Sequence, residues 1–181
     1  MSFGFCFLDI ETTGLDPDKD VILEVAVVIT DSDLNELVAY NYPIQYELDN
    51  TEWWPDVVKE MHKESGLYED LIVTRAGVPV GIAQLNIEDD LLYWKTLQEF
   101  ERLHLAGNSI HFDASFLKVH MPRVSALFHH RMLDCSSFKL LGGTVGRELV
   151  SENPHPHRAL SDAYESLSLA RICKEWITPH D

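Results

Sequence analysis

The chain has 181 residues, which is long enough for one domain with a buried core and short for two, so we expect residues 1–181 to form a single domain. Hydrophobic residues make up 45% of it and charged residues 24%, a globular composition that argues against intrinsic disorder. With 14 Lys and Arg against 30 Asp and Glu, the net charge is −16, which argues against a long basic groove for a polynucleotide. Either nucleic acid is not the ligand, or it is short and held through metal.

Three cysteines, Cys6, Cys135 and Cys173, lie far apart in the sequence, and their spacing fits neither a metal site nor a redox motif. Free thiols in a reducing compartment are the better interpretation. The first residues lack the basic segment of a secretory signal, and no apolar stretch approaches the ~20 residues that span a membrane. We therefore expect a cytoplasmic protein without a membrane partner.

The predicted elements begin with three strands. Residues 3–8 are apolar and rich in aromatics, which is typical of a strand buried on both faces, and we expect this strand to end at Asp9. Gly, Asp and Pro in residues 11–20 predict a turn. Further strands are predicted at 21–30 and 34–46, so the chain opens as a meander.

The rest of the chain alternates helices and strands. Helices are predicted at 53–66, 87–103, 112–121 and about 158–176, and strands at 103–110 and 131–134. Three strands followed by this alternation indicate an α/β fold, a mixed sheet with helices on its faces. Functional sites in such sheets collect at strand ends near the centre, and the first strand carries carboxylates there.

Two carboxylates stand at the end of that first strand. Asp9 and Glu11 alternate with Ile10, so on an extended strand both side chains point to the same face. They would repel unless a cation stood between them, and oxygen ligands suit Mg²⁺ or Mn²⁺. Helix caps or solvated turn residues are the alternative. Downstream, Asp113 opens a predicted helix, where an N-cap role is as good an interpretation as a ligand role.

The last helix adds one more carboxylate, Asp162, with His157 just upstream. In this order and spacing, the four carboxylates and the histidine resemble the DEDD-type 3′→5′ exonucleases, histidine subclass. Further stretches resemble the oligoribonuclease family within it. These are "GLDP" after Asp-x-Glu, "SGL" at Ser65 after His62, the "GNSI" block that begins at Gly107, and "FHHRMLDCSSFK".

The resemblance implies an RNase H-like three-layer fold with a central mixed five-stranded sheet flanked by helices. It also implies a metal-dependent 3′→5′ exoribonuclease that degrades short oligoribonucleotides to 5′-mononucleotides. Four carboxylates would hold two divalent ions, Mg²⁺ or Mn²⁺, and they are Asp9, Glu11, Asp113 and Asp162. Asp9 would bridge the two ions. His157 would be the general base, because it has the family spacing to Asp162, which the rival His155 lacks.

The resemblance also implies contacts to the 3′ nucleotide. Leu15 would wedge between bases, while Thr12 and Gly14 would let the backbone approach the terminal sugar. Val57 stands where the family has a stacking Trp, so Trp54, one helical turn earlier, is the substitute, with a core position as the alternative. The family resemblance assigns His62 to substrate binding as well.

A second group would close on the 5′ phosphate, with contributions from both subunits of a homodimer. It comprises Ser109, His129, His130, Arg131 and Ser136, and Asn108 is expected to be a further substrate contact. His130 departs from the family, which has Tyr there, and this puts strict selectivity for dinucleotides in doubt. An exonuclease that trims or proofreads single-stranded DNA is the alternative function. A catalytically dead binding module is disfavoured because all four carboxylates and His157 are present.

Overall fold

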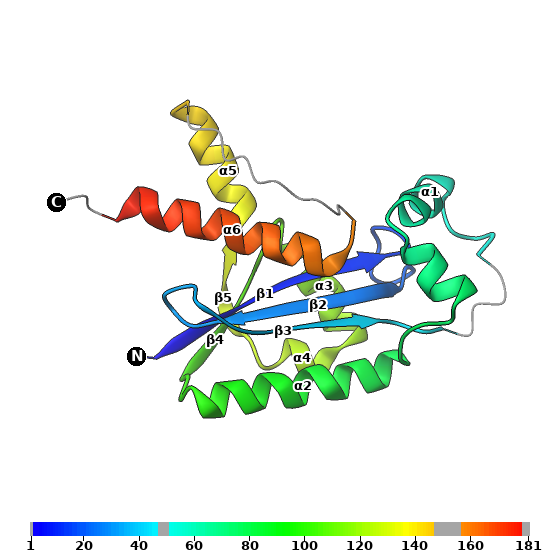
Figure 1. The fold of residues 1–181 in the computed structure, drawn as a ribbon, viewed down its shortest axis with the longest axis horizontal. Helices are drawn as coiled ribbons and strands as arrows, with labels where there is room; N and C mark the ends of the chain where they lie inside the picture. The colour runs from blue at the N-terminus through cyan, green and yellow to red at the C-terminus, as the bar shows by residue number, and fades with distance from the viewer. Residues whose placement is uncertain (1, 47–50, 147–156, 179–181) are drawn as a thin grey trace.

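A computed structural model of the chain describes residues 2–46, 51–146 and 157–178. Its described strands form one five-stranded sheet with the order β3-β2-β1-β4-β5 (Figure 1). The strands are β1 (Phe3–Thr12), β2 (Ile22–Thr30), β3 (Glu36–Pro43), β4 (Arg102–Gly107) and β5 (His129–Asp134). β1 to β3 form an antiparallel meander, whereas β1, β4 and β5 are parallel. The predicted mixed five-stranded sheet is therefore confirmed.

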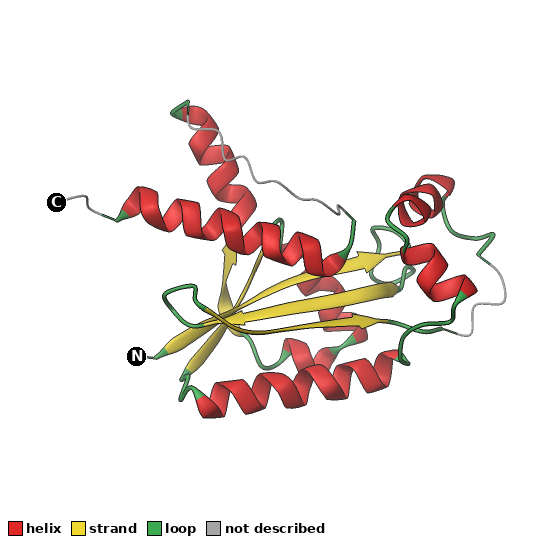
Figure 2. Cartoon of the chain, in the orientation of Figure 1, coloured by secondary structure: helices red, strands yellow, loops and turns green. Residues whose placement is uncertain are grey.

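Helices cover both faces of the sheet and make three layers (Figure 2). One face carries α6, and α2, α3 and α4 pack on the other. The described helices are α1 (Asp56–Glu64), the π-helix η1 (Glu69–Val73), α2 (Val80–Leu97), α3 (His111–His120), α4 (Pro122–Ser125), α5 (Cys135–Thr144) and α6 (Ala159–Ile177). None of them is long and apolar enough to cross a membrane.

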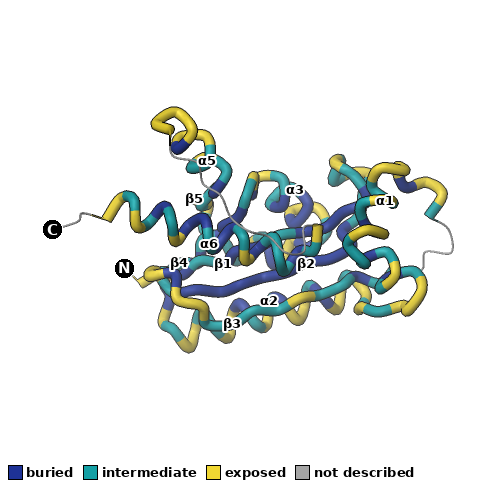
Figure 3. Tube along the Cα trace, turned by 45° about the horizontal axis from the view of Figure 1, so that its top comes forward, coloured by how far each residue is buried: buried dark blue, intermediate teal, exposed yellow. Residues whose placement is uncertain are grey.

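The alternation of side chains along β1 decides where its carboxylates point. Cys6, Leu8 and Ile10 belong to the core beneath α2 and α3, whereas Phe7 belongs to the core beneath α6. Side chains two residues apart share a face, so Asp9 follows Phe7 onto the α6 side. β2 is buried along its whole length, because helices cover both of its faces (Figure 3).

A smaller apolar cluster fixes α1 and η1 against the end of the sheet. Leu23 of β2 meets Trp54, Leu67 and Leu71 there, and all four side chains are buried. Such satellite clusters beneath loops hold a segment in place without extending the main core. The segment that carries α1 is thereby placed beside the end of β1.

Several boundaries differ from the prediction. β1 continues past Asp9 to Thr12, because its pairing with β2 persists through Glu11. The helix predicted at 87–103 is α2, which begins just after Pro79, whose φ of −55° suits a helix start. It ends before Glu99, which adopts a left-handed φ of 53°. The short elements η1, α4 and α5 were not predicted.

Candidate active site

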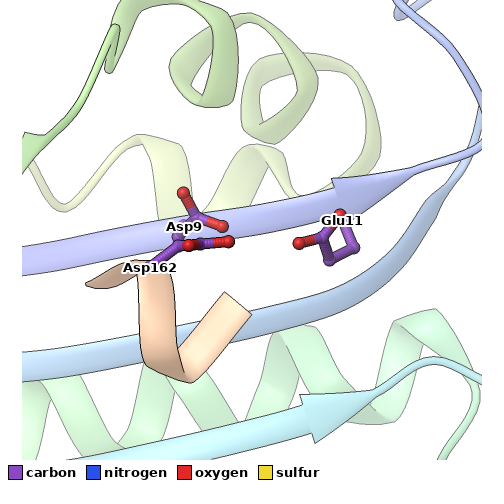
Figure 4. Close-up of side chains that lie close together, drawn as sticks. All are labelled: Asp9, Glu11 and Asp162. Atoms are coloured by element: carbon purple, nitrogen blue, oxygen red, sulfur yellow. The ribbon is translucent and has the colours of Figure 1, made fainter. Parts of the chain in front are cut away.

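Three carboxylates meet where β1 runs beneath the first turn of α6. Asp9 and Glu11 come from β1 and Asp162 from α6, and their side chains lie near one another (Figure 4). One oxygen from each carboxylate can be chosen so that all three lie within 4.8 Å of one another. This cluster joins residues more than a hundred positions apart in the sequence.

The electrostatics of the cluster favour a cation. Loss of solvent around its carboxylate, followed by repulsion from Asp113 and Asp162, raises the pKa of Asp9 well above its usual range. Burial first, and then the charge of Asp162, raises the pKa of Glu11 to about 8. Three close carboxylates offer only oxygen donors, which are the ligands of hard divalent ions. The residues present therefore fit a divalent metal.

Asp113 lies beside this cluster. Its side chain is buried, and its Oδ1 atom accepts a hydrogen bond of 3.0 Å from the backbone N–H of Ile10, between Asp9 and Glu11. Burial raises the pKa of Asp113 to about 8. Asp113 thus adds negative charge to the surroundings of Asp9, although it is outside the group of three that lie within 4.8 Å.

His157 precedes α6 and is exposed. Its backbone N–H donates a hydrogen bond of 3.0 Å to Oδ2 of Asp162. It also adopts a φ of 61°, a left-handed conformation that non-glycine residues rarely take and that tends to occur at functional sites. His155, the rival for the role of base, lies outside the described residues.

A pocket of about 520 Å³ opens beside the carboxylates. Its walls come from the end of β1, the turn that follows, α1 and the first turn of α3. Glu11 contributes to this lining, so the pocket and the cluster are continuous. Leu15 and Val57 line it as well, with exposed fractions of 83% and 76%, which shows that neither side chain serves the core.

The turn after β1 is held in shape by Asp20. Its carboxylate accepts hydrogen bonds from the backbone N–H of Asp16 and the hydroxyl of Thr13. A Cβ atom at Gly14 would lie 2.5 Å from the Asp20 oxygens, so a larger residue there would displace the Asp20 carboxylate. The Thr12 hydroxyl donates to the carbonyl of Gly14. The turn therefore presents Leu15 on a fixed backbone.

The stacking role predicted for Trp54 is wrong in this structure, because its side chain is only 2% exposed. The Trp54 indole packs edge-on against His62 and Tyr68 in the cluster beneath α1, which is the core alternative. The aromatic residue that does line the pocket is Phe112. Sequence reasoning missed it, and its place immediately before Asp113 was the available signal.

His62 also differs from the prediction of a substrate contact, because its side chain is completely buried. Its Nε2–H donates a hydrogen bond of 3.0 Å to the carbonyl of Thr12, and its Nδ1 atom lies 3.9 Å from Oε2 of Glu11. Burial lowers the pKa of His62, so the ring stays neutral at pH 7. His62 therefore supports the end of β1 from behind.

Ser109 and Ser136 gather around one carboxylate. Oδ1 of Asp134 accepts hydrogen bonds from the backbone N–H of both serines and from the Ser136 hydroxyl. Asn108, next to Ser109, is half-buried. These residues lie at the end of β5 and beside α3, so they form a polar group near Asp113.

The histidines and the arginine of β5 lie elsewhere. The rings of His129 and His130 are 4.1 Å apart, and Arg131 is exposed. His129 pairs through β4 with Phe5 of β1, and Asp9 is four residues further along β1, a strand rise of ~13 Å. One copy of the chain therefore does not bring His129 to its own carboxylate cluster.

Comparison with known proteins agrees with the fold. The chain matches the exonuclease family RNase_T over residues 6–170. It belongs to this family and is a 3′→5′ exonuclease, as the resemblance predicted.

Oligoribonucleases are among its relatives within the family. The chain is 36% identical to the oligoribonuclease of Tropheryma whipplei, with 90% of this chain and 86% of that protein covered. It is also 36% identical to the oligoribonuclease of Corynebacterium diphtheriae, with 89% and 77% covered.

A likeness to a solved structure supports the fold alone. Escherichia coli exonuclease I, in a complex with zinc ion and single-stranded DNA, superposes with a TM-score of 0.68 at 15% identity. The alignment covers 97% of this chain, which spans 41% of exonuclease I. The RNase H-like three-layer fold is thereby confirmed.

Proposed function

We propose that this protein is a metal-dependent exoribonuclease that shortens oligoribonucleotides, down to dinucleotides, and releases 5′-mononucleotides. One observation carries the proposal: Asp9, Glu11 and Asp162 meet within 4.8 Å beside a pocket that Glu11 itself lines. A terminal nucleotide in that pocket would have its phosphodiester next to the carboxylates. The substrate class, oligoribonucleotides, is inferred from two relatives that are oligoribonucleases.

The metal ligands in this proposal are Asp9, Glu11, Asp113 and Asp162, which would hold two divalent ions, Mg²⁺ or Mn²⁺. The raised pKa values of Asp9, Glu11 and Asp113 support this, since closely held carboxylates need a compensating positive charge. When bound, such ions stabilise the attacking and leaving oxygens of a phosphodiester displacement.

His157 acts as the general base. It takes a proton from the attacking water as the new P–O bond forms and the bond from phosphorus to the 3′ oxygen of the preceding nucleotide breaks. The imidazole ring has a nitrogen that can accept that proton. Its backbone contact to Asp162 supports the role, because it keeps His157 at the edge of the carboxylate cluster.

The 3′ nucleotide occupies the pocket between the turn and α1. Thr12 and Gly14 supply backbone close to the sugar, Leu15 contacts the base from the turn, and Phe112 offers the aromatic surface that Trp54 does not. His62 contributes indirectly, since it holds the carbonyl of Thr12.

The 5′ phosphate is bound by the second group, Ser109, His129, His130, Arg131 and Ser136, and Asn108 contacts the substrate beside Ser109. The ~13 Å that separate His129 from Asp9 along the sheet support a site shared between the subunits of a homodimer. Exposed Leu140, Leu141 and Val145 on and after α5 are available to that interface. His130 in place of the family tyrosine relaxes the selection for dinucleotides.

Charge and cysteine state support a short substrate and a cytoplasmic location. A net charge of −16 disfavours the counterion release on which affinity for long polynucleotides depends. All three cysteines are buried free thiols, which suits a reducing compartment. Residues 1–181 act as one domain in this proposal.

The test uses 5′-labelled RNA and DNA of two to ten nucleotides with Mg²⁺, Mn²⁺ or chelator, and Asp9→Ala as the control. We expect metal-dependent release of mononucleotides, fastest from the shortest RNA, and no activity in Asp9→Ala. Faster cleavage of DNA than of RNA would support the alternative, trimming of single-stranded DNA. Activity that survives both the chelator and Asp9→Ala would refute the mechanism.

A further inference from the structure

Glu24 is a further buried carboxylate close to the site, and it is not one of the proposed metal ligands. It pairs with Glu11 across β1 and β2, and its side chain is 0% exposed. Oε2 of Glu24 accepts a hydrogen bond of 2.9 Å from the backbone N–H of Ala159, the first residue of α6. Asn41 donates to Oε1 at 3.0 Å. Glu24 thus ties the start of α6 to the centre of the sheet.

Arg158 completes this attachment. Its guanidinium lies on Glu24 through two nitrogens, with Nη2 at 2.8 Å from Oε1 and Nε at 3.3 Å from Oε2. Such a paired contact of a planar guanidinium on a carboxylate fixes orientation as well as distance. Nη2 also lies 3.0 Å from Oδ2 of Asp70 in η1. Arg158 therefore joins β2, η1 and α6.

Arg158 is connected to two residues that the proposed function assigns to catalysis, His157 and Asp162. His157 precedes it in the left-handed conformation, and the Asp162 backbone N–H donates to the Arg158 carbonyl at 3.1 Å. The His157 N–H in turn donates to the Asp162 carboxylate. A shift of Arg158 would therefore displace the general base and a metal ligand together.

We infer that Glu24 and Arg158 are positioning residues that set the place of His157 and Asp162 for phosphodiester hydrolysis. Through Asp70, the same contacts connect α6 to the α1 and η1 segment, which supplies one wall of the nucleotide pocket. This inference rests on the proposed function, because it assigns no step of its own. Arg158 acts through its neighbours rather than on the substrate.

The first test separates positioning from substrate binding. Glu24→Gln keeps the size of the side chain, but its amide can no longer accept from both Arg158 and Ala159. In Glu24→Gln and Arg158→Gln, we expect kcat to fall by ~10- to 100-fold, as for other residues that orient ligands, while KM changes less than about twofold. Arg158→Lys, which keeps one charged donor, recovers part of kcat. A rise in KM with kcat unchanged would overturn the inference, because it would place Arg158 on the substrate.

A matched control is Arg123→Gln. Arg123 pairs with Glu88 at 2.7 Å between α4 and α2, on the opposite face of the sheet from α6. Loss of this surface pair leaves kcat and KM within about twofold of the unaltered protein. If Arg123→Gln and Arg158→Gln lose kcat equally, and the loss in each variant parallels its fall in melting temperature, the cause is lost stability. That result would overturn the inference.

The second test asks whether the contacts act through His157. In a His157→Ala background, Arg158→Gln should lower kcat by a smaller factor than it does in the unaltered protein, because the part of its effect that passes through His157 is already lost. Full multiplication of the two losses would contradict the inference. Amide hydrogen exchange adds a structural measurement. Exchange at Ala159 should be faster in Glu24→Gln, because this substitution weakens the hydrogen bond of the Ala159 N–H. An unchanged exchange rate together with an unchanged kcat would also contradict the inference.

Assays on two substrates distinguish a failure of the positioning role from a failure of the proposed function. All variants are assayed on thymidine 5′-(p-nitrophenyl phosphate), a small phosphodiester, as well as on a ribodinucleotide. If the unaltered protein cleaves the small diester but no RNA, the short-RNA proposal fails and the positioning test still stands. If the variants keep full kcat on both compounds, the positioning role fails and the proposed function stands.

Discussion

The backbone N–H of Ile10 donates a hydrogen bond to the Asp113 carboxylate at 3.0 Å, which connects α3 to β1 between two of the site's carboxylates. The Ile10 side chain lies in the core, and its N–H ties α3 to β1 beside Asp9 and Glu11. Asp113 therefore supports the local structure in addition to any metal that it binds.

This double role predicts opposite effects for two substitutions. Asp113→Asn keeps an oxygen for Ile10 and removes a negative charge, so its stability in chelator at pH 8.5 should equal or exceed that of the unaltered protein. Asp113→Ala leaves the Ile10 N–H unpaired in a buried place and should cost about 1–3 kcal/mol. Urea denaturation measures both, and activity should be lost in each. Equal destabilisation by Asn and Ala would contradict the role of this hydrogen bond.

The raised pKa values of Asp9 and Glu11 predict how stability depends on pH without metal. For Glu11 the pKa rises from 4.5 to about 8, so the folded chain binds this proton more tightly than the unfolded chain does. The resulting stability is present below pH 4.5 and is lost as pH rises toward 8. The melting temperature in chelator should therefore fall across that range, and Mg²⁺ should raise it more at pH 8 than at pH 5.

The matched control for this pH dependence is the Asp9→Asn, Glu11→Gln double variant. It removes both carboxylates, and its melting temperature in chelator should vary less with pH than that of the unaltered protein. The difference between the two proteins also cancels contributions from the acidic residues far from the site, because both proteins contain them. Parallel curves for the two would show that Asp9 and Glu11 are not the cause.

Local patterns predicted part of the site and not the rest. The alternation of a strand was enough to place Asp9 and Glu11 on one face, because that geometry depends on adjacent residues. Asp162 joins them only through the packing of α6 across the sheet, and no local pattern encodes that contact. The order of motifs in a known family supplied it instead, and the family itself is confirmed by the comparisons.

Trp54 and Phe112 show why the pocket could not be predicted. Trp54 was placed one helical turn before Val57, but α1 begins only at Asp56, so helical spacing does not apply to residue 54. The chain before α1 instead turns the indole into the cluster with Leu23. Which aromatic residue reaches the pocket depends on how α1 and α3 are placed around the end of β1, and that is a tertiary relationship.

Phe112 therefore provides a direct prediction about nucleotide binding. Phe112→Leu keeps an apolar side chain and removes the ring, which should forfeit ~1–3 kcal/mol of base stacking and raise KM for a dinucleotide at least about fivefold. Trp53→Leu is the matched control, because Trp53 is 50% exposed and does not line the pocket. Steady-state kinetics on dinucleotides measure both, and an equal change in KM for the two variants would refute a stacking role.

Leu15 predicts a change in binding without a change in stability. Its side chain is 83% exposed, so Leu15→Ala should alter the free energy of unfolding by less than about 0.5 kcal/mol. If Leu15 contacts the base, kcat/KM on dinucleotides should nevertheless fall severalfold. Urea denaturation and kinetics on the same preparation decide this, and an unchanged kcat/KM would leave Leu15 without a role in the pocket.

The proposed sharing of the site between subunits predicts that two inactive variants restore each other. Asp9→Ala removes a metal ligand, whereas Arg131→Ala removes a phosphate contact. In a mixed dimer, the intact carboxylates of one subunit would face the intact Arg131 of the other. Random pairing of equal amounts makes half of the dimers mixed, with one complete site of two, so roughly a quarter of the original activity should return. The two proteins are unfolded and refolded together, and dinucleotide cleavage is compared with that of each variant refolded alone. Activity no greater than the average of the separate variants would show that each site is complete within one subunit.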